Sequence, residues 1–107
     1  MADPIRIRAR HRGGLTEVMV LMPHAMETGL RQEPAGSFVP AHYITEVLVA
    51  LVGAAGQRTV LEARMSNAVS RDPLLSFRFR GGQPGERLRV TWLDNLGLRR
   101  SDDVAIV

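Results

Sequence analysis

The residues best suited to chemistry in this sequence lie in the run Met22-Pro23-His24-Ala25-Met26-Glu27, where two methionines flank a histidine. Thioether sulfur suits Cu(I), and imidazole suits copper in either oxidation state. Met22, His24 and Met26, with His42 as a further ligand across the following loop, could therefore bind copper. Methionine is also a common space-filling residue in cores and adaptable surfaces. From spacing alone we favour the packing role and predict no metal and no cofactor. A periplasmic copper-binding β-sandwich is the alternative.

Outside this run, no residues form a catalytic pattern. The sequence has no Gly-x-Ser-x-Gly elbow and no phosphate-binding glycine loop, because the glycine-rich run 81–85 connects two predicted strands and is typical of a hairpin turn. Cysteine is absent, which excludes a disulfide framework, a cysteine-ligated metal site and a thiol nucleophile on this chain. We therefore predict no catalytic residues, and a chain that is not an enzyme by itself.

Arginine supplies all the positively charged side chains of this sequence, apart from any protonated histidine. All 14 basic residues are arginines, which raises the pI to about 10.9 although the net charge is only +3. The 11 acidic residues are interspersed with them, so nucleic acid is not an expected partner. No apolar run reaches the roughly 18 residues of a membrane span, and the N-terminus lacks the apolar region of a signal peptide. We expect no membrane association.

Alternation of apolar and polar residues with period two predicts the elements that position these side chains. We expect seven strands, over residues 4–10, 15–22, 43–52, 59–64, 75–80, 87–92 and 98–106. A helix competes over 43–52, but the β-branched residues and the Gly-Ala-Ala-Gly turn that follows favour a strand. The apolar run Val18–Met22 predicts that the second strand is buried on both faces, and Trp92 is expected in the core. Seven short strands in 107 residues predict a single domain, 1–107, with an immunoglobulin-like antiparallel β-sandwich and no disulfide.

The alternation stops between Pro23 and Pro40. This stretch contains three prolines besides two glycines, which is the composition of a long ordered loop. Loops of this length are uncommon inside compact domains and are often functional. A second irregular stretch, 65–73, carries the turn-forming residues Ser66, Asn67, Ser70 and Asp72.

The loop residues His24-Ala25-Met26-Glu27-Thr28-Gly29-Leu30-Arg31, followed by Gly36, Pro40 and the pair Tyr43-Ile44, carry a family resemblance. They resemble the signature of the Z subunit of the Sox sulfur-oxidation carrier, a His-Pro-Met-Glu-Thr-Gly-Leu-Arg run followed by a proline and an aromatic-isoleucine pair. Ser70-Arg71-Asp72-Pro73 is similar to the family's Ser-x-Asn-Pro turn, and Leu88–Trp92 with Asp94 and Gly97 is similar to its closing hairpin. The chain departs from the pattern at Ala25, which replaces proline, and at Asp72, which replaces asparagine.

The resemblance implies a division of labour with a second protein. In this family the Z subunit pairs with a SoxY-type subunit, whose C-terminal Gly-Gly-Cys-Gly-Gly arm carries sulfur intermediates during thiosulfate oxidation, while other Sox enzymes act on those adducts. The absence of cysteine agrees with this role, since a thiolate carrier needs a cysteine. The resemblance also implies the periplasm, reached as a passenger on the partner that bears the export signal.

A non-catalytic subunit of this kind needs an interface, which for a stable heterodimer buries on the order of 1,600 Å². The long loop is the best source of anchoring residues, because Met, Tyr and Arg are enriched in interfaces. The expected heterodimer or heterotetramer interface comprises His24, Met26, Glu27, Thr28, Gly29, Arg31, Phe38, Pro40 and Tyr43. A homodimer of the isolated chain and a general adhesion or assembly module remain open.

Overall fold

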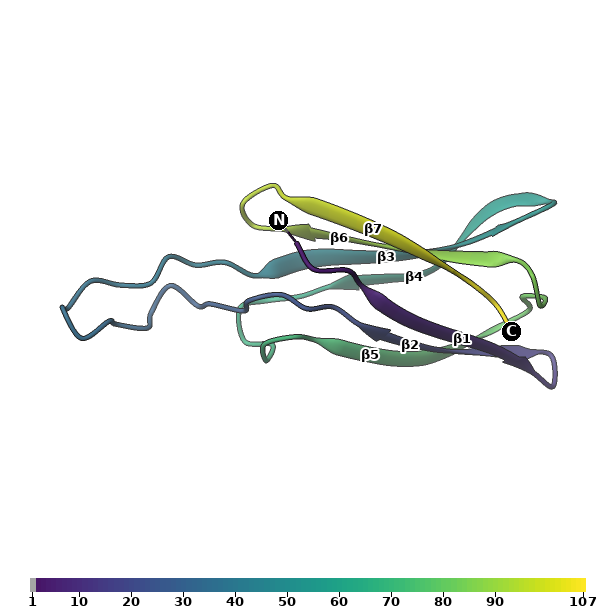
Figure 1. Cartoon of the computed structure of the whole chain (residues 1–107), viewed down its shortest axis with the longest axis horizontal. Coiled ribbons are helices and arrows are strands. Elements are labelled where there is room, and N and C mark those ends of the chain that lie inside the picture. Colours follow the sequence, from purple (N-terminus) through teal and green to yellow (C-terminus); the bar gives the residue numbers. More distant parts are fainter. Residues whose placement is uncertain (1) are drawn as a thin grey trace.

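The computed structural model describes residues 2–107 and contains seven strands joined by turns and two longer loops (Figure 1). No helix among the described residues is long and apolar enough to cross a membrane. The expected immunoglobulin-like β-sandwich is confirmed, with every strand pair antiparallel. The strands are β1 (Arg6–Arg12), β2 (Leu15–Leu21), β3 (Ile44–Gly53), β4 (Gly56–Arg64), β5 (Leu74–Arg80), β6 (Arg87–Asp94) and β7 (Arg99–Ala105).

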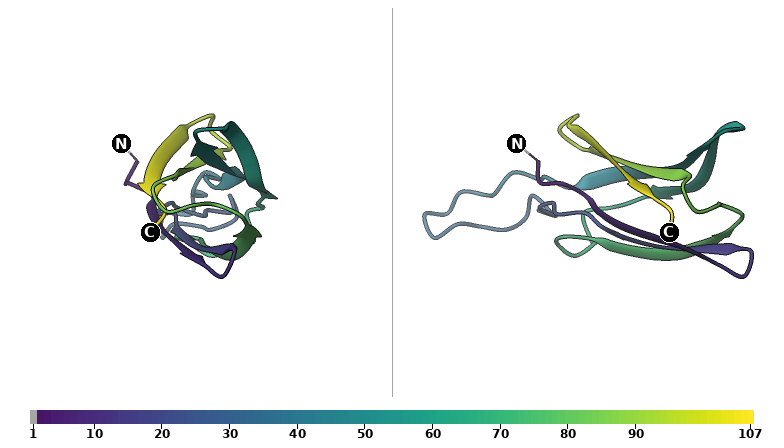
Figure 2. Two further views of the ribbon diagram at one scale, coloured as in Figure 1. Left: turned by 90° about the vertical axis from the view of Figure 1, so that its right-hand side faces the viewer. Right: turned by 45° about the vertical axis from the view of Figure 1, so that its right-hand side comes forward.

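The strands form two sheets that lie face to face, as the end-on view in Figure 2 shows. One sheet has the order β1-β2-β5 and the other the order β4-β3-β6-β7. Alternate residues of each strand point inward, so the core is built from the apolar halves of the two-residue pattern. On β6 these are Leu88, Val90 and Trp92, all buried, which confirms the core position expected for the tryptophan.

The prediction that the second strand is buried on both faces is wrong. Val18 and Val20 on β2 are fully buried, but Met19 between them is 45% exposed. In register it lies between Arg8 of β1 and Ser76 of β5, on the outer surface of the three-stranded sheet. A sandwich of two layers covers only one face of each sheet, so even its central strands keep one side open to solvent.

The C-terminal residues close the sandwich along the side where β1 and β7 meet. The amide of Val107 donates to the carbonyl of Ala9 at 3.0 Å, and the amide of His11 donates to the carbonyl of Val107 at 2.8 Å. Ile106 is buried between the sheets. These bonds lie along the edge of β1 that does not pair with β2, where the backbone groups would otherwise have no partner.

The chain between β2 and β3 runs out and back as a hairpin-shaped arm, residues 23–43, that extends beyond the sandwich (Figure 1). The arm accounts for the elongated shape, with extents of 54 × 22 × 20 Å. Isolated bridges between Glu27 and His42 and between Gln32 and Phe38 hold its two sides together. Gly29, at a φ of +85°, faces Ala41 so closely that an added Cβ would crowd it, which explains why this position suits glycine.

Candidate functional site

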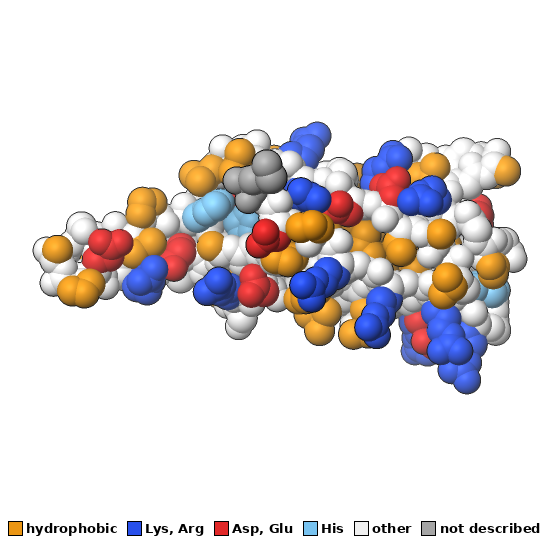
Figure 3. Space-filling view, in the orientation of Figure 1, with side chains coloured by type: hydrophobic (Ala, Val, Ile, Leu, Met, Phe, Trp, Pro, Cys, Tyr) orange, Lys and Arg blue, Asp and Glu red, His pale blue; other side chains and the backbone are white. Residues whose placement is uncertain are grey.

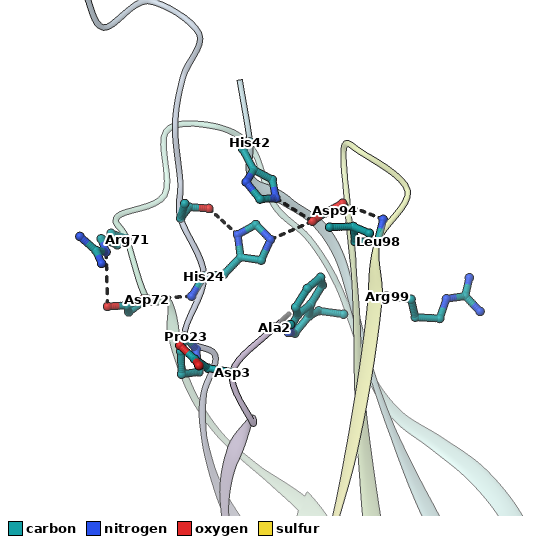
Figure 4. Close-up of a pocket in the computed structure, with 12 residues that line it drawn as sticks. Ala2, Asp3, Pro23, His24, His42, Arg71, Asp72, Asp94, Leu98 and Arg99 are labelled. Carbon is teal, nitrogen blue, oxygen red and sulfur yellow. Dashed lines mark hydrogen bonds and ion pairs between the residues drawn. The ribbon is translucent and has the colours of Figure 1, made fainter. Parts of the chain in front are cut away.

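The base of the arm brings together three polar side chains from distant parts of the sequence. His24 and His42 stand on the two sides of the arm, and Asp94 ends β6. The Nε2 atoms of the two histidines lie 3.0 and 2.9 Å from the same carboxylate oxygen, Oδ2 of Asp94 (Figure 4). The imidazole rings themselves lie edge to face, with centroids 4.6 Å apart. We call this arrangement the His–Asp–His triangle.

Asp94 is almost completely buried, at 3% exposed, and accepts four hydrogen bonds. Its Oδ2 faces the two imidazoles, and its Oδ1 accepts the backbone amides of Leu96 at 3.0 Å and Leu98 at 2.9 Å. Burial raises the pKa of this carboxyl, but the hydrogen bonds from His24, His42 and the two amides outweigh burial and hold the pKa below its usual value. Asp94 is therefore a carboxylate that fixes both the β6–β7 turn and the base of the arm.

His24 is held on all sides. Its Nδ1 contacts the carbonyl oxygen of Ala25, and its ring stands edge-on against Trp92, with centroids 4.7 Å apart. Its backbone exchanges two bonds with Asp72, whose Oδ1 accepts the amide of His24 at 2.9 Å and whose amide donates to the carbonyl of His24 at 3.0 Å. Asp72 has a φ of +53°, a left-handed conformation that Asp and Asn tolerate better than other side chains.

A pocket opens beside the triangle. Its lining includes the triangle and, at the rim, the charged residues Asp3, Asp72, Arg71 and Arg99 (Figure 4). Trp92 also lines it, and the indole N–H, although buried, has no hydrogen-bond partner among the described residues. His24 and Asp94 are thus buried, His42 is partly exposed, and the triangle borders a space that a small ligand or solvent can enter.

Residues 5–105 match the model of the family described as "Sulphur oxidation protein SoxZ". This match covers nearly the whole chain. The chain belongs to the SoxZ family. A search of curated proteins gives no match.

Among solved structures, this SoxZ-family chain is similar in fold to a hypothetical protein and to superoxide reductases. A hypothetical protein from Pyrococcus horikoshii OT3 has a TM-score of 0.69 at 17% identity, covering 99% of this chain and 89% of that one. A superoxide reductase in the oxidised state has a TM-score of 0.68 at 17% identity, covering 96% and 86%. A variant of the superoxide reductase (neelaredoxin) from Archaeoglobus fulgidus has a TM-score of 0.63 at 19% identity, covering 95% and 84%. Identities this low establish a common fold only.

The structure does not bring Met22, His24 and Met26 together as the copper site that was considered from the sequence. Met22 is fully buried at the end of β2 and belongs to the core. Met26 packs against the core, and its sulfur accepts the amide of Ile44 at 3.4 Å. Both methionines therefore have the packing role favoured from the sequence, whereas His24 and His42 do come together.

The predicted interface residues of this SoxZ-family chain divide into two groups. His24 is buried in the triangle, while Met26, Glu27, Gly29 and Tyr43 are partly buried near the base of the arm. The exposed members, all on the arm, are Thr28, Arg31, Phe38 and Pro40. Arg31 pairs with Glu27 at 2.8 Å on the surface of the arm.

The sequence reasoning missed two residues. Leu30 is 77% exposed on the arm and is the most exposed large apolar side chain among the described residues. Asp94 was noted only as part of the closing hairpin, although it continues the series Leu88, Val90, Trp92 at every second position. That period places the Asp94 side chain on the inward face of β6 and was the available signal for a buried carboxylate.

Proposed function

We propose that this chain is the non-catalytic partner subunit of the periplasmic SoxYZ carrier, supporting a SoxY-type subunit whose C-terminal cysteine arm carries the sulfur intermediates of thiosulfate oxidation. The SoxZ-family match over residues 5–105 carries this proposal. The composition supports it, because a chain without cysteine cannot hold sulfur as a thiolate adduct.

We assign the arm as the principal contact with the SoxY-type partner. Leu30 and Phe38 are 77% and 60% exposed, and Figure 3 shows hydrophobic side chains along the arm between acidic and basic ones. Exposed aromatic and apolar groups with a charged surround resemble the anchors and rim of a protein interface. The predicted interface residues Thr28, Arg31 and Pro40 flank these two anchors on the same projection.

The base of the arm supports this role by limiting the freedom of the arm. Asn95, in the β6–β7 turn, accepts the amide of Tyr43 through its side-chain oxygen at 2.8 Å and donates its side-chain amide to the carbonyl of Ala41 at 2.9 Å. On the other side, Asn67 donates to the carbonyl of Thr28 at 3.3 Å. A segment that is held in one conformation before binding loses less entropy when the complex forms.

The remaining partners follow from the same assignment. The chain and the SoxY-type subunit form a heterodimer or a heterotetramer, and other Sox enzymes contact this chain through that complex. Nucleic acid and membranes are not partners. A copper-binding sandwich is the less favoured function, because the two thioethers are engaged in packing.

The test is co-purification of the chain with a SoxY-type subunit, with the affinity measured by calorimetry. The double variant Leu30→Ser with Phe38→Ser removes both anchors and should weaken binding by at least about tenfold, since an interface anchor is worth more than roughly 1.4 kcal/mol. The control is Leu74→Ser on β5, which removes from the body of the sandwich a leucine that is 57% exposed, close to the 60% of Phe38.

Two results would overturn parts of the proposal. Unchanged affinity in the double variant, with a loss in the control, would move the interface from the arm to the sandwich. No detectable binding of the unaltered chain to any SoxY-type subunit would overturn the partner role itself.

A further inference from the structure

The His–Asp–His triangle has the ligand atoms of a metal site. One nitrogen from each of His24 and His42 and one oxygen of Asp94 lie within 4.8 Å of one another. Two imidazoles and a carboxylate form a donor set that divalent first-row transition metals prefer. The three ligands come from three separate segments, which the fold holds in place before any ion binds.

The contacts of the two His24 ring nitrogens show why the triangle suits a cation. A neutral imidazole has one N–H, and the Nδ1 of His24 faces the carbonyl oxygen of Ala25, which can only accept a hydrogen bond. Nδ1 can therefore donate to this carbonyl, while Nε2 faces Oδ2 of Asp94, 3.0 Å away. Either a proton on Nε2 or a metal ion in its place can join this nitrogen to the carboxylate oxygen.

The outer contacts of the triangle are those that support a metal ligand. A histidine that binds a metal through Nε2 usually donates its other N–H to a carbonyl or carboxylate, which fixes the ring, and His24 makes this contact with Ala25. The carboxylate is oriented in the same way, because the free oxygen of Asp94 accepts the amides of Leu96 and Leu98. These contacts hold the three side chains so that Nε2 of both histidines faces Oδ2 of Asp94.

We propose that His24, His42 and Asp94 bind one divalent transition-metal ion, with Zn²⁺ as the representative ion. A tetrahedral Zn²⁺ ion holds its ligand atoms about 3.3 Å apart. This is a few tenths of an ångström more than the 3.0 and 2.9 Å between each Nε2 and Oδ2, and the two Nε2 atoms lie within 4.8 Å of each other. The protein supplies three ligands, and the neighbouring pocket gives the fourth position access to water or a small anion. Three protein ligands with an open position are the arrangement that makes a bound metal chemically accessible.

This site differs from the thioether copper site considered from the sequence, because its third ligand is a carboxylate and neither methionine takes part. An oxygen donor with two imidazoles disfavours Cu(I), which prefers soft sulfur ligands, and favours divalent ions. A bound ion would also join the two sides of the arm to the β6–β7 turn through metal–ligand bonds. The site requires no second protein, so it stands independently of the proposed partner role.

Calorimetric titration of the full, EDTA-treated chain with ZnCl₂ tests the proposal. We expect one Zn²⁺ per chain with a dissociation constant in the micromolar range or tighter. The variant His42→Gln removes one ligand, and because this side chain is 33% exposed we expect the variant to fold. It should weaken Zn²⁺ binding more than about 100-fold. His11→Gln, on β1 and outside the triangle, is the matched control and should bind as the unaltered chain does.

A spectroscopic measurement locates the ion. Trp92 is the only tryptophan of the chain and contacts the ring of His24, so bound Co²⁺ should quench its fluorescence with the same 1:1 stoichiometry. In nuclear magnetic resonance spectra, one equivalent of Zn²⁺ should shift Nε2 of His24 and His42 and leave His11 unchanged.

The outcomes separate cleanly. Absence of saturable Zn²⁺ binding up to millimolar concentration overturns the proposal, as does binding that His42→Gln leaves intact or that His11→Gln removes. Loss of Zn²⁺ affinity in His42→Gln, with unchanged binding to a SoxY-type subunit in the absence of metal, supports the metal site. That result leaves the partner role to its own test.

Discussion

The base and the tip of the arm contrast sharply in how they are held. At the base, His24 and His42 share a buried carboxylate, and backbone bonds from two loops fix both sides. At the tip, residues 30–38, the bonds are those within the arm itself, such as the amide of Val39 to the carbonyl of Arg31 at 2.8 Å. A surface ion pair joins the two parts, since Glu27 lies near the base and Arg31 at the start of the tip.

The difference indicates that the two ends of the arm serve different purposes. A buried polar network with every acceptor satisfied is rigid and costly to disturb. A projection with exposed apolar side chains adds little to the stability of the isolated chain, because those side chains remain in contact with water. We therefore expect substitutions to act on stability at the base and on partner binding at the tip.

The largest loss of stability should follow Asp94→Ala at the base. This change leaves two backbone amides and two imidazoles without their acceptor, so the free energy of unfolding should fall by about 3–5 kcal/mol. Urea denaturation measures the difference. The control Asp103→Ala removes a partly exposed carboxylate that pairs with Arg89 on the sheet surface and should change stability little. Equal losses in the two variants would remove the distinction drawn for the base.

A smaller, pH-dependent effect is expected at Glu27, near the base of the arm. Hydrogen bonds from Arg31, together with its charge, lower the pKa of Glu27 below the usual 4.5. A carboxyl whose pKa is lowered by folding contributes stability above its unfolded pKa, and that contribution is lost as the pH falls through the folded pKa. Glu27→Gln should therefore have a slightly lower free energy of unfolding than the unaltered chain at pH 7. This difference should shrink as the pH falls below 4.5 and through the lowered pKa of Glu27.

Denaturation curves at pH 7 and pH 3 check this prediction for Glu27. The control is Glu62→Gln on β4, an exposed carboxylate that forms no ion pair among the described residues. If the difference in free energy of unfolding between Glu27→Gln and the unaltered chain stayed the same at pH 3, the Glu27–Arg31 pair would not act through the charge of the carboxylate.

The smallest effect on stability is expected at the tip. Leu30→Ser with Phe38→Ser exchanges side chains that are mostly in water, so the free energy of unfolding should stay within about 0.5 kcal/mol of the unaltered chain. The same samples should lose affinity for the SoxY-type partner. A large loss of stability would show instead that these side chains pack against the molecule in solution.

Much of the fold was accessible from the sequence because period-two alternation reports directly which face of a strand is buried. The alternation of Leu88, Val90 and Trp92 with polar residues predicted both the strand and the burial of the tryptophan, and the structure confirms both. The apolar run around Met19 led to the wrong prediction that both faces of this strand are buried. An uninterrupted apolar run does not reveal whether a second layer covers the outer face. The observed sandwich leaves that face open.

The candidate site was accessible only in part. His24 and His42 were noted as possible ligands, but their shared partner, Asp94, is 52 residues from the nearer histidine. Local spacing carries no information about such a contact, since it depends on how the β6–β7 turn meets the base of the arm. The alternative considered from the sequence grouped His24 with Met22 and Met26, which the fold directs into packing.

The sequence by itself determined the strands, the absence of thiol chemistry and the family, because these depend on residue types, on local periodicity and on a contiguous motif. Only the tertiary structure decided that the long loop is a projecting arm with exposed Leu30 and Phe38, and that its base encloses a buried carboxylate between two imidazoles. The physical reason is that a buried charge is tolerated only where several donors converge on it. Such convergence arises when segments distant in the chain are packed against one another.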